Sequence, residues 1–353
     1  MEPRNATGGV SRVAYYLPRE LAKKVNVTLF PSFKISFGYF KHISEIYRDF
    51  FAERFEIVHF NVVPALINGS YALLELARTK SVGTVLNIHG IIPLEHKLEP
   101  SLGRIPQMSL IYTLRACKLV DKIVVNSKYI KDLVIDWYNI KPEKIVVIPH
   151  GVDFEKFNKC RTRVALPGDP AILYVGKFSE RKGLDILFQA VRELRWELPR
   201  LKLHLVGFGE QELFRGLAKE LGIEDLIVFH GWVEDHKLPA YYKSADLCVF
   251  PSKYESFGFV FLEAMASGCP MIATPVGIVP EIVIHGVNGI IVEPNNSDLL
   301  AKTILILARD KDLRIKLSQN ATETAKKYTW DRIGEIYVAL YKKLLEEKLG
   351  QAL

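Results

Sequence analysis

Two glutamates, Glu255 and Glu263, lie eight positions apart in a segment that could bind a polyhydroxylated ligand. The segment follows an apolar run that predicts a strand, so Glu255 is expected in the loop at the carboxyl end of that strand. Residues 256–258 are expected to begin the helix that carries Glu263. Free amides at a helix start bind hydroxyl or phosphate oxygens, and a carboxylate accepts paired hydrogen bonds from a diol such as that of ribose. Spacing alone favours a simpler interpretation, a solvated loop residue and a surface charge on a helix.

The string around these glutamates and other short motifs resemble a known family. Glu-Ser-Phe-Gly-Phe-x-x-x-Glu-Ala-Met-Ala at 255–266 is similar to the Glu-x7-Glu signature of retaining glycosyltransferase family 4 (glycosyl transferases group 1). Matching segments follow in order at 8–10, 89–90, 150–153, 176–177, 182–183, 206–209, 231–233, 277–281 and 286–289, over nearly the whole chain. The resemblance implies the GT-B fold and transfer of a hexose from a nucleotide diphospho-sugar with retention of anomeric configuration.

The resemblance also implies roles for single residues. Lys177 and Lys182 match basic positions that contact the donor diphosphate; they flank a predicted strand-to-helix turn, where two ammonium groups can neutralise it. Lys182 can instead be a surface charge, although a cation at a helix start is mildly unfavourable. Glu263 is expected to hold the donor ribose. Glu255 is expected to hold sugar hydroxyls, together with the amides around Phe257 and Gly258.

Three glycines and a histidine complete the expected site. Gly9 precedes a predicted helix, where its backbone can approach a phosphate closely. Gly207 and Gly209 are expected near the nucleotide; they form half of a dinucleotide-binding fingerprint, because position 212 is not glycine, so a nicotinamide site is unsupported. His89 ends a predicted strand and is implied to lie near the transferred sugar, with a hydrogen-bonded structural histidine as the alternative. His150 is expected to be structural.

No metal ion or other cofactor is expected. Asp310, Lys311 and Asp312 fit the Asp-x-Asp string with which another glycosyltransferase fold holds a divalent ion, but they lie far from any predicted strand end. Lys177, Lys182 and helix N-termini can neutralise the leaving nucleoside diphosphate without a metal. The sugar is expected to pass through an oxocarbenium-like state. A front-face path, with the leaving phosphate as the base, is the mechanism that the resemblance implies.

The elements that must position these residues alternate between strands and helices. Apolar runs predict strands at 25–30, 57–60, 84–88, 122–125 and 144–148, and again at 171–175, 201–206, 226–229, 245–250, 270–273 and 289–292. Helical spacing of apolar residues connects them, for example over 184–194 and 213–221. This alternation predicts an α/β protein with two doubly wound Rossmann-like domains that face each other across a cleft.

A polar stretch with prolines and a glycine at 157–170 predicts the domain boundary. We expect an acceptor-binding domain over 1–163, a nucleotide-sugar donor-binding domain over 164–329, and a C-terminal helix over 330–348 that packs back on the first domain. A length of 353 residues fits two domains. Residues 1–7 are polar and contain Pro3, where the family normally has a hydrophobic strand. A missing strand would expose sheet edges and puts the position of Gly9 in question.

Composition narrows the class of protein further. A hydrophobic fraction of 49% and a charged fraction of 25% exclude a disordered or collagen-like chain. The apolar runs fall short of the ~18 residues that span a bilayer, and the first residues lack a signal-peptide pattern. The four cysteines are scattered, which argues against a disulfide scaffold or a zinc site and fits a reducing cytoplasm.

The net charge of +7 is unevenly distributed. Residues 1–163 carry 24 Lys and Arg against 15 Asp and Glu, whereas the rest carries 23 against 25. The excess indicates an acidic acceptor or an anionic membrane surface, or only a solvated surface. Aromatic and basic residues interleave at 30–42, which suits a bilayer interface and a lipid-linked acceptor, unless the aromatics pack into the domain. We expect a cytoplasmic protein, peripheral on the inner membrane face, that does not bind nucleic acid.

Two other functions remain open. A nucleotide-sugar 2-epimerase of related fold would act on the same class of donor without an acceptor, although the Glu-x7-Glu string favours a transferase. A donor-binding protein without transferase activity would follow from the missing first strand. UDP- and GDP-sugars are both candidate donors, and the acceptor is expected to be a sugar or a lipid-linked sugar.

Overall fold

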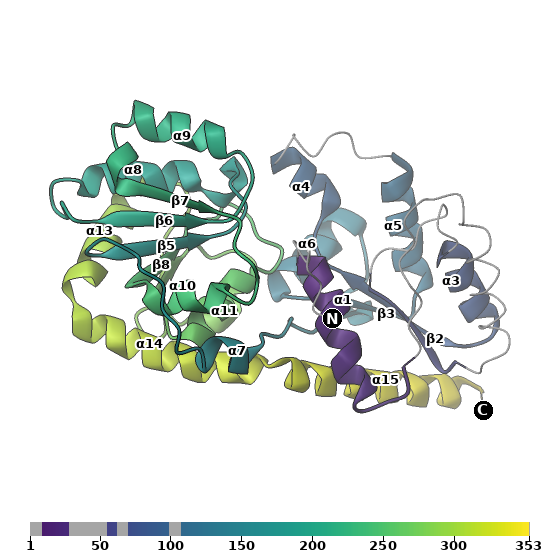
Figure 1. The fold of residues 1–353 in the computed structure, drawn as a ribbon. Helices are drawn as coiled ribbons and strands as arrows, with labels where there is room; N and C mark the ends of the chain where they lie inside the picture. Colours follow the sequence, from purple (N-terminus) through teal and green to yellow (C-terminus); the bar gives the residue numbers. More distant parts are fainter. Residues whose placement is uncertain (1–8, 28–54, 62–69, 99–106, 353) are drawn as a thin grey trace. The chain divides into compact units, whose positions relative to one another are not determined.

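The computed structural model describes residues 9–27, 55–61, 70–98 and 107–352 (Figure 1). The chain forms two compact units. One unit, here called the continuous unit, is Gly151–Thr329, and the other, the split unit, combines Asn5–His150 with Trp330–Leu353. The continuous unit thus begins ahead of the boundary predicted between 163 and 164. The helix predicted at 330–348 belongs to the split unit.

The continuous unit contains a six-stranded parallel sheet with the order β10-β9-β8-β5-β6-β7. This is the strand order of a doubly wound nucleotide-binding sheet, in which the order reverses between β5 and β8. In such sheets, ligands bind outside the carboxyl ends of the strands at the reversal. The strands are β5 (Ala171–Val175), β6 (Lys202–Val206), β7 (Ile227–Gly231), β8 (Leu247–Phe250), β9 (Met271–Ala273) and β10 (Ile290–Ile291).

The apolar content of these segments explains the sheet. All five residues of β5 and all four of β8 are buried, as parallel strands covered on both faces require. Between them, α8 buries an apolar stripe that includes Leu184, Leu187 and Val191. The helices of this unit are α7 (Phe154–Asn158), α8 (Leu184–Leu194), α9 (Gln211–Glu220), α10 (Leu238–Ser244), α11 (Phe259–Ser267), α12 (Val279–Ile282), α13 (Ser297–Arg309) and α14 (Lys311–Ala325), with short 3-10 turns η4 (Glu180–Lys182), η5 (Glu224–Leu226) and η6 (Lys326–Tyr328).

The split unit contains a four-stranded parallel sheet among its described residues, with the order β1-β2-β3-β4. The strands are β1 (Ile57–Phe60), β2 (Gly83–Ile88), β3 (Lys122–Val125) and β4 (Ile145–Val147), close to four of the predicted ones. The helices are α1 (Gly9–Ala22), α3 (Ser70–Thr79), α4 (Ile92–Leu98), α5 (Gln107–Leu119), α6 (Lys128–Tyr138) and α15 (Trp330–Ala352), and η3 (Pro142–Lys144) precedes β4.

One predicted strand of this unit differs from the structure. The prediction at 25–30 is wrong for residues 25–27, which lie in no strand, and its remaining residues lie outside the described ones. Residues 1–7, where the family's first strand was expected to be missing, also lie outside the described residues.

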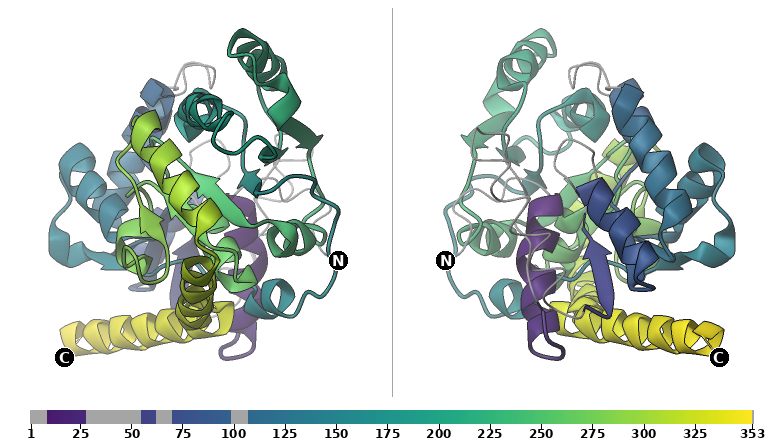
Figure 2. Two further views of the ribbon diagram at one scale, coloured as in Figure 1. Left: turned by 90° about the vertical axis from the view of Figure 1, so that its left-hand side faces the viewer. Right: turned by 90° about the vertical axis from the view of Figure 1, so that its right-hand side faces the viewer.

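The closing helix α15 packs against α1 and β2 of the split unit, and Figure 2 shows α1 in purple beside the start of α15 in yellow. The rings of Tyr16 and Trp330 stack with centroids 5.3 Å apart. Farther along α15, the Tyr337 hydroxyl donates to Asn87 Oδ1 of β2 at 3.2 Å. Ile333, Tyr337, Leu340 and Leu344 of α15 are buried, so the apolar face of this helix is used within the unit.

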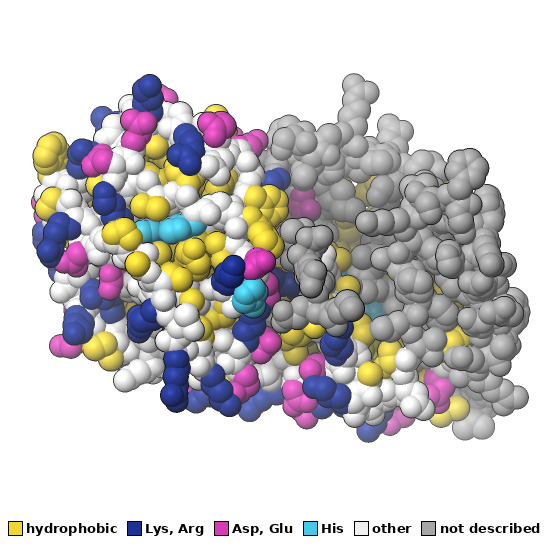
Figure 3. Space-filling view, in the orientation of Figure 1, with side chains coloured by type: hydrophobic (Ala, Val, Ile, Leu, Met, Phe, Trp, Pro, Cys, Tyr) yellow, Lys and Arg dark blue, Asp and Glu magenta, His cyan; other side chains and the backbone are white. Residues whose placement is uncertain are grey.

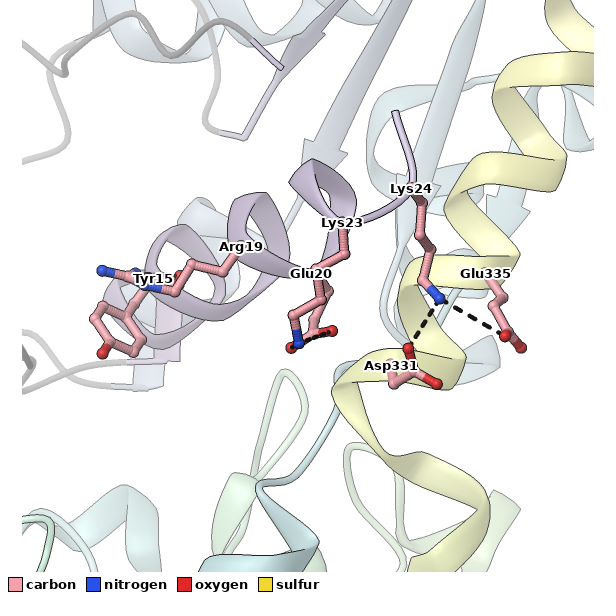
Figure 4. A network of polar contacts seen from close by, with 7 residues as sticks. All are labelled: Tyr15, Arg19, Glu20, Lys23, Lys24, Asp331 and Glu335. Carbon is pink, nitrogen blue, oxygen red and sulfur yellow. Dashed lines mark hydrogen bonds and ion pairs between the residues drawn. The ribbon is translucent and has the colours of Figure 1, made fainter. Parts of the chain in front are cut away.

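Polar contacts at the end of α1 reinforce the same packing (Figure 4). Lys24 Nζ lies 2.8 Å from Asp331 Oδ1 and 3.7 Å from Glu335 Oε1. Gly334 provides the room for this approach, since a Cβ atom there would lie only 3.2 Å from Cβ of Glu20. These exposed ion pairs add little stability by themselves, so the ring stack and the buried face of α15 dominate.

Candidate functional site

The candidate site of the continuous unit lies at the carboxyl ends of β5 and β8. Lys177 follows β5, and the segment from Pro251 to Glu255 follows β8. β5 and β8 are paired neighbours at the point where the strand order reverses, so their loops begin side by side. This is where the sequence analysis placed the diphosphate-binding and sugar-binding residues.

The loop after β5 is held down by a tyrosine and a glycine. Burial and the nearby negative charge of Glu255 raise the pKa of Tyr174 well above its usual value, so its hydroxyl stays protonated. That hydroxyl donates to the carbonyl oxygen of Lys177 at 2.9 Å. At the end of the loop, Gly183 has a φ of +70°, and a Cβ atom there would lie 2.0 Å from the carbonyl oxygen of Pro251. Only glycine permits this approach.

The close approach of Gly183 to Pro251 brings two of the predicted site residues, Lys182 and Glu255, into contact. The Lys182 ammonium forms an ion pair with Glu255 Oε1, and the two side chains are 14% and 9% exposed. Ser252 Oγ donates to the same carboxylate oxygen at 3.2 Å. Removing either charge would take from a nearly buried partner the opposite charge that offsets its burial, which is costly, so the pair is a unit. The solvated-loop interpretation of Glu255 is wrong.

Glu263 is also buried, with 2% of the residue exposed. It lies on α11, and the hydroxyl of Tyr242 on α10 donates to Glu263 Oε2 at 3.0 Å. The alternative of a helix surface charge is therefore wrong. Glu263 is the one charged residue of this mainly apolar helix (Phe-Val-Phe-Leu-Glu-Ala-Met-Ala-Ser), and a buried carboxylate is costly unless hydrogen-bond donors or a ligand offset its burial.

The start of α11 differs slightly from the prediction. The helix begins at Phe259 rather than within 256–258, and Gly258 is its N-cap with a φ of +87°. Phe257 is 2% exposed, and its carbonyl accepts a hydrogen bond from the Ile278 amide at 3.0 Å. The side chain of Phe257 thus belongs to the core, and a ligand contact at this position would involve the backbone.

Gly207 and Gly209 lie in the loop after β6. A Cβ atom on Gly207 would lie 1.8 Å from the Gly176 carbonyl oxygen, and one on Gly209 would lie 2.4 Å from that of Phe178. Close packing against the loop after β5 therefore already requires both glycines. Their contact with a nucleotide stays a prediction.

Gly9 and His89 lie in the split unit, whereas the other predicted site residues lie in the continuous unit. Gly9 is the exposed first residue of α1. His89 follows β2, and its Nε2 donates to the carbonyl oxygen of Asn61 at 2.6 Å. Burial lowers the pKa of His89, so the ring is neutral near pH 7 and Nδ1 carries a lone pair. His150 Nε2 lies 3.4 Å from that Nδ1.

The candidate metal motif has a structural explanation. Asp310 is the N-cap of α14 and accepts a hydrogen bond from the Leu313 amide at 2.8 Å, and Asp312 lies in the first turn of that helix. Within the described ranges, no group of three or more His, Cys, Asp or Glu side chains is placed to hold a metal ion. Among the helices of the same residues, none is long and apolar enough to cross a membrane.

Sequence reasoning did not single out Ser252, Tyr242 or Tyr174 as contacts of the site. Ser252 lies in the loop before the Glu-x7-Glu string. Its position three residues before Glu255 is the sequence signal that could have identified it. Tyr242 and Tyr174 come from other elements and reach the site only through the packing of α10 and β5.

Known proteins that resemble this chain identify its family and its fold. A family model described as "Glycosyl transferases group 1" matches residues 158–324, and one described as "Glycosyltransferase Family 4" matches residues 7–156. The chain is similar to sucrose-phosphate synthase of Thermosynechococcus elongatus (TM-score 0.75, 23% identity, 96% of this chain and 94% of that one). It is also similar to Anabaena HepE, solved with UDP and glucose (TM-score 0.73, 20% identity, 97% and 98%). These likenesses establish the GT-B fold.

Curated relatives extend the likeness to sequence. An uncharacterized glycosyltransferase of Methanocaldococcus jannaschii is 34% identical over 251 residues, which cover 68% of this chain and 63% of that protein. A D-inositol 3-phosphate glycosyltransferase of Streptomyces bingchenggensis is 32% identical over 242 residues, which cover 64% of this chain and 53% of that protein. The chain belongs to the family 4, group 1 glycosyltransferases. It spans little more than half of the length of these relatives.

Proposed function

We propose that the protein transfers a hexose from a UDP- or GDP-sugar to a sugar or lipid-linked acceptor, with retention of anomeric configuration and without a metal ion. The observation that carries this proposal is a pair of oppositely charged, nearly buried side chains at the β5–β8 reversal, followed by a second buried glutamate on the next helix. Lys182 and Glu255 form a nearly buried pair there, and the buried Glu263 follows on α11. The family membership gives this grouping its chemical meaning.

The proposed roles follow from charge and position. Lys177 and Lys182 neutralise the diphosphate as the bond to the sugar breaks. Because an ammonium group has three donors, Lys182 can keep its contact with Glu255 while it binds a phosphate oxygen. Glu255 accepts hydrogen bonds from sugar hydroxyls, and Glu263 accepts them from the ribose diol. The roles expected for His89 and for the backbone at Gly9, both in the split unit, stay predictions.

In the proposed reaction, the sugar gains oxocarbenium character as the nucleoside diphosphate leaves. The acceptor hydroxyl attacks from the side of the leaving group, and the departing phosphate takes its proton. No resident metal is needed, because Lys177, Lys182 and backbone amides provide positive charge and donors.

Two observations guide the choice of substrates. HepE, which has the same fold, binds UDP and glucose, so UDP-glucose is a suitable first donor. The excess of basic residues before residue 164 favours an anionic acceptor. D-inositol 3-phosphate, named for one relative, is such an acceptor. The side chains visible on the continuous unit in Figure 3 mix both charges. A peripheral place on the inner face of the membrane stays a prediction, since residues 30–42 lie outside the described ones.

The proposal is tested by a thermal-shift panel of UDP-, GDP- and ADP-sugars on the wild type and on Glu263→Ala. A bound donor stabilises the fold by an amount that grows with its concentration relative to Kd, about 2.7 kcal/mol at one hundred times Kd. We expect at least one UDP- or GDP-sugar to stabilise the wild type and none to stabilise the variant. Glu220→Ala, which removes an exposed carboxylate from α9, is the matched control and should respond like the wild type.

Turnover completes the test. The stabilising donor is incubated with candidate acceptors and also alone. Transfer to an acceptor supports the proposal. Conversion of the donor to an epimer without an acceptor would support the epimerase instead, and near-normal transfer by Glu263→Ala would contradict the role given to Glu263.

A further inference from the structure

The segment from Pro251 to Phe257 is fixed by three neighbouring elements. On one side, Gly183 packs its backbone against the Pro251 carbonyl. The Thr274 hydroxyl, just after β9, donates to the Ser252 carbonyl oxygen at 2.6 Å. The Ile278 amide donates to the Phe257 carbonyl at 3.0 Å. A loop held in this way gives the side chains of Ser252 and Glu255 defined positions.

Ser252 is nearly as buried as the core around it, with 2% of the residue exposed. Its backbone is held by Thr274, and its hydroxyl donates to Glu255 Oε1 at 3.2 Å. A buried serine hydroxyl with a carboxylate as its acceptor forms a charge-assisted bond, which is stronger and more directional than a bond between neutral groups. Any effect of the Ser252 hydroxyl on the site therefore acts through Glu255.

The two oxygens of the Glu255 carboxylate are not equivalent. Both Lys182 and Ser252 contact Oε1. No hydrogen bond from the described residues ends on Oε2. The charge of Glu255 contributes to the raised pKa of Tyr174. The Tyr174 hydroxyl nevertheless donates to the Lys177 carbonyl oxygen and not to Glu255. The carboxylate thus has one oxygen engaged by protein and one available to a ligand.

Lys182 by itself would not fix this orientation. Its ammonium is a compact charge on a flexible stem, and it attracts either carboxylate oxygen equally well. It is also the group assigned to the donor diphosphate, so in the donor complex its ammonium is shared between Glu255 and a phosphate oxygen. Ser252 has neither property, because its short side chain reaches only the oxygen that faces it.

We infer that Ser252 is a positioning residue for the sugar subsite: its hydroxyl holds Glu255 Oε1, so that Oε2 is presented to a hydroxyl group of the donor hexose. This inference rests on the proposed function. It predicts that Ser252 affects recognition of the sugar and leaves recognition of the nucleotide unchanged.

The test measures the affinities of UDP and UDP-glucose, and of GDP and GDP-mannose, by titration calorimetry. For the pair that the wild type binds, the ratio of nucleotide-sugar affinity to nucleotide affinity reports the contribution of the sugar. In Ser252→Ala we expect this ratio to fall about ten-fold, the effect of losing a hydrogen bond to a charged group. The nucleotide affinity should stay within about two-fold of the wild type, which a merely structural role would not produce.

Ser267→Ala is the matched control. Ser267 lies at the end of α11, is 3% exposed, and its hydroxyl has no hydrogen-bond partner among the described residues. Its removal deletes a buried serine hydroxyl from the same unit without touching Glu255, so the affinity ratio should not change.

A double-mutant cycle tests whether Ser252 acts through Glu255. In the Glu255→Ala background, Ser252→Ala should leave the ratio unchanged within about two-fold. A further ten-fold loss there would overturn the inference, as would a wild-type ratio in Ser252→Ala or an equal loss of affinity for nucleotide and nucleotide-sugar. If the wild type binds none of the four compounds, the proposed donor site itself is refuted, and the inference with it.

Discussion

The carboxylates of the continuous unit are buried in two different ways. Glu255 offsets its burial with the ammonium of Lys182 and the hydroxyl of Ser252. Glu263 accepts a hydrogen bond from Tyr242 across the α10–α11 packing. The first arrangement can exchange a charged partner with a ligand, whereas the second holds a carboxylate in place. This difference suits the proposed sugar contact at Glu255, beside the lysine assigned to the diphosphate, and the proposed ribose contact at Glu263.

At the scale of single residues, His59 of β1 predicts a pH dependence of stability. Burial lowers the pKa of His59 to about 4. Its Nδ1 lies 2.6 Å from the hydroxyl oxygen of Tyr341 on α15. In the unfolded chain the pKa is about 6.5. The unfolded state therefore binds more protons between these values, and the stability present above pH 6.5 is lost as the pH falls toward 4.

For His59 alone, the free energy of unfolding should fall by about 2 kcal/mol between pH 7 and pH 5. In His59→Gln, whose side chain does not titrate, the free energy of unfolding should fall by about 2 kcal/mol less than in the wild type. Guanidinium unfolding of both proteins at the two pH values measures this difference. Equal falls in the two proteins would show that His59 is not the group responsible. The fall in the variant measures the other buried histidines, such as His89 and His150, whose pKa values burial also lowers.

At the scale of elements, the site depends on how closely the loops after β5 and β8 approach. Gly183 ends η4 and begins α8, and its backbone lies against Pro251. A side chain at position 183 would push the loop away and separate Lys182 from Glu255. Gly222 offers a matched comparison, because its φ of +65° is nearly the same and no atom lies within 4 Å of a Cβ placed there.

We expect Gly183→Ala to abolish donor-dependent stabilisation and to lower the free energy of unfolding by more than Gly222→Ala does. The strain of a left-handed conformation costs both variants about 1 kcal/mol. Only Gly183→Ala adds the clash with Pro251. Thermal unfolding with and without UDP-glucose measures both effects. Wild-type donor binding by Gly183→Ala would show that the approach of the two loops is not required.

The elements themselves follow closely from sequence patterns, whereas their contacts do not. Short apolar runs predicted β5, β6 and β8 to within two residues, because buried parallel strands need continuous apolar residues. The burial of Glu263 could not be predicted from the local sequence, because it depends on how α10, which carries Tyr242, packs against α11. The pairing of Lys182 with Glu255 depends on the Gly183–Pro251 contact, for which the local sequence holds no signal.

At the scale of the whole molecule, each unit has its own hydrophobic core. One core runs from Val152 to Ala325 in the continuous unit, and the other from Val58 to Ile145 in the split unit. Among the residues that the structure describes, none belongs to both cores. The sequence predicted two domains from length and alternation, and the family assignment explains why each half needs its own sheet.

Separate cores predict two calorimetric transitions rather than one. UDP should raise the temperature of only one of them, since the residues assigned to the nucleotide lie mainly in the continuous unit. Gly183→Ala should lower the temperature of that same transition and so identify it. A single transition with equal calorimetric and van't Hoff enthalpies, shifted as a whole by UDP, would contradict this expectation.

The division of the split unit between the two ends of the chain has a consequence for biosynthesis. The ribosome makes all of Gly151–Thr329 before it makes α15, whose Tyr337 and Lys348 bind Asn87 and Asp121 of the first half. At 5–20 residues per second, the earlier sheet waits roughly ten to forty seconds for its covering helix. During that time the nascent first half presents the apolar surface that α15 later covers, and such transiently exposed surface is prone to aggregation.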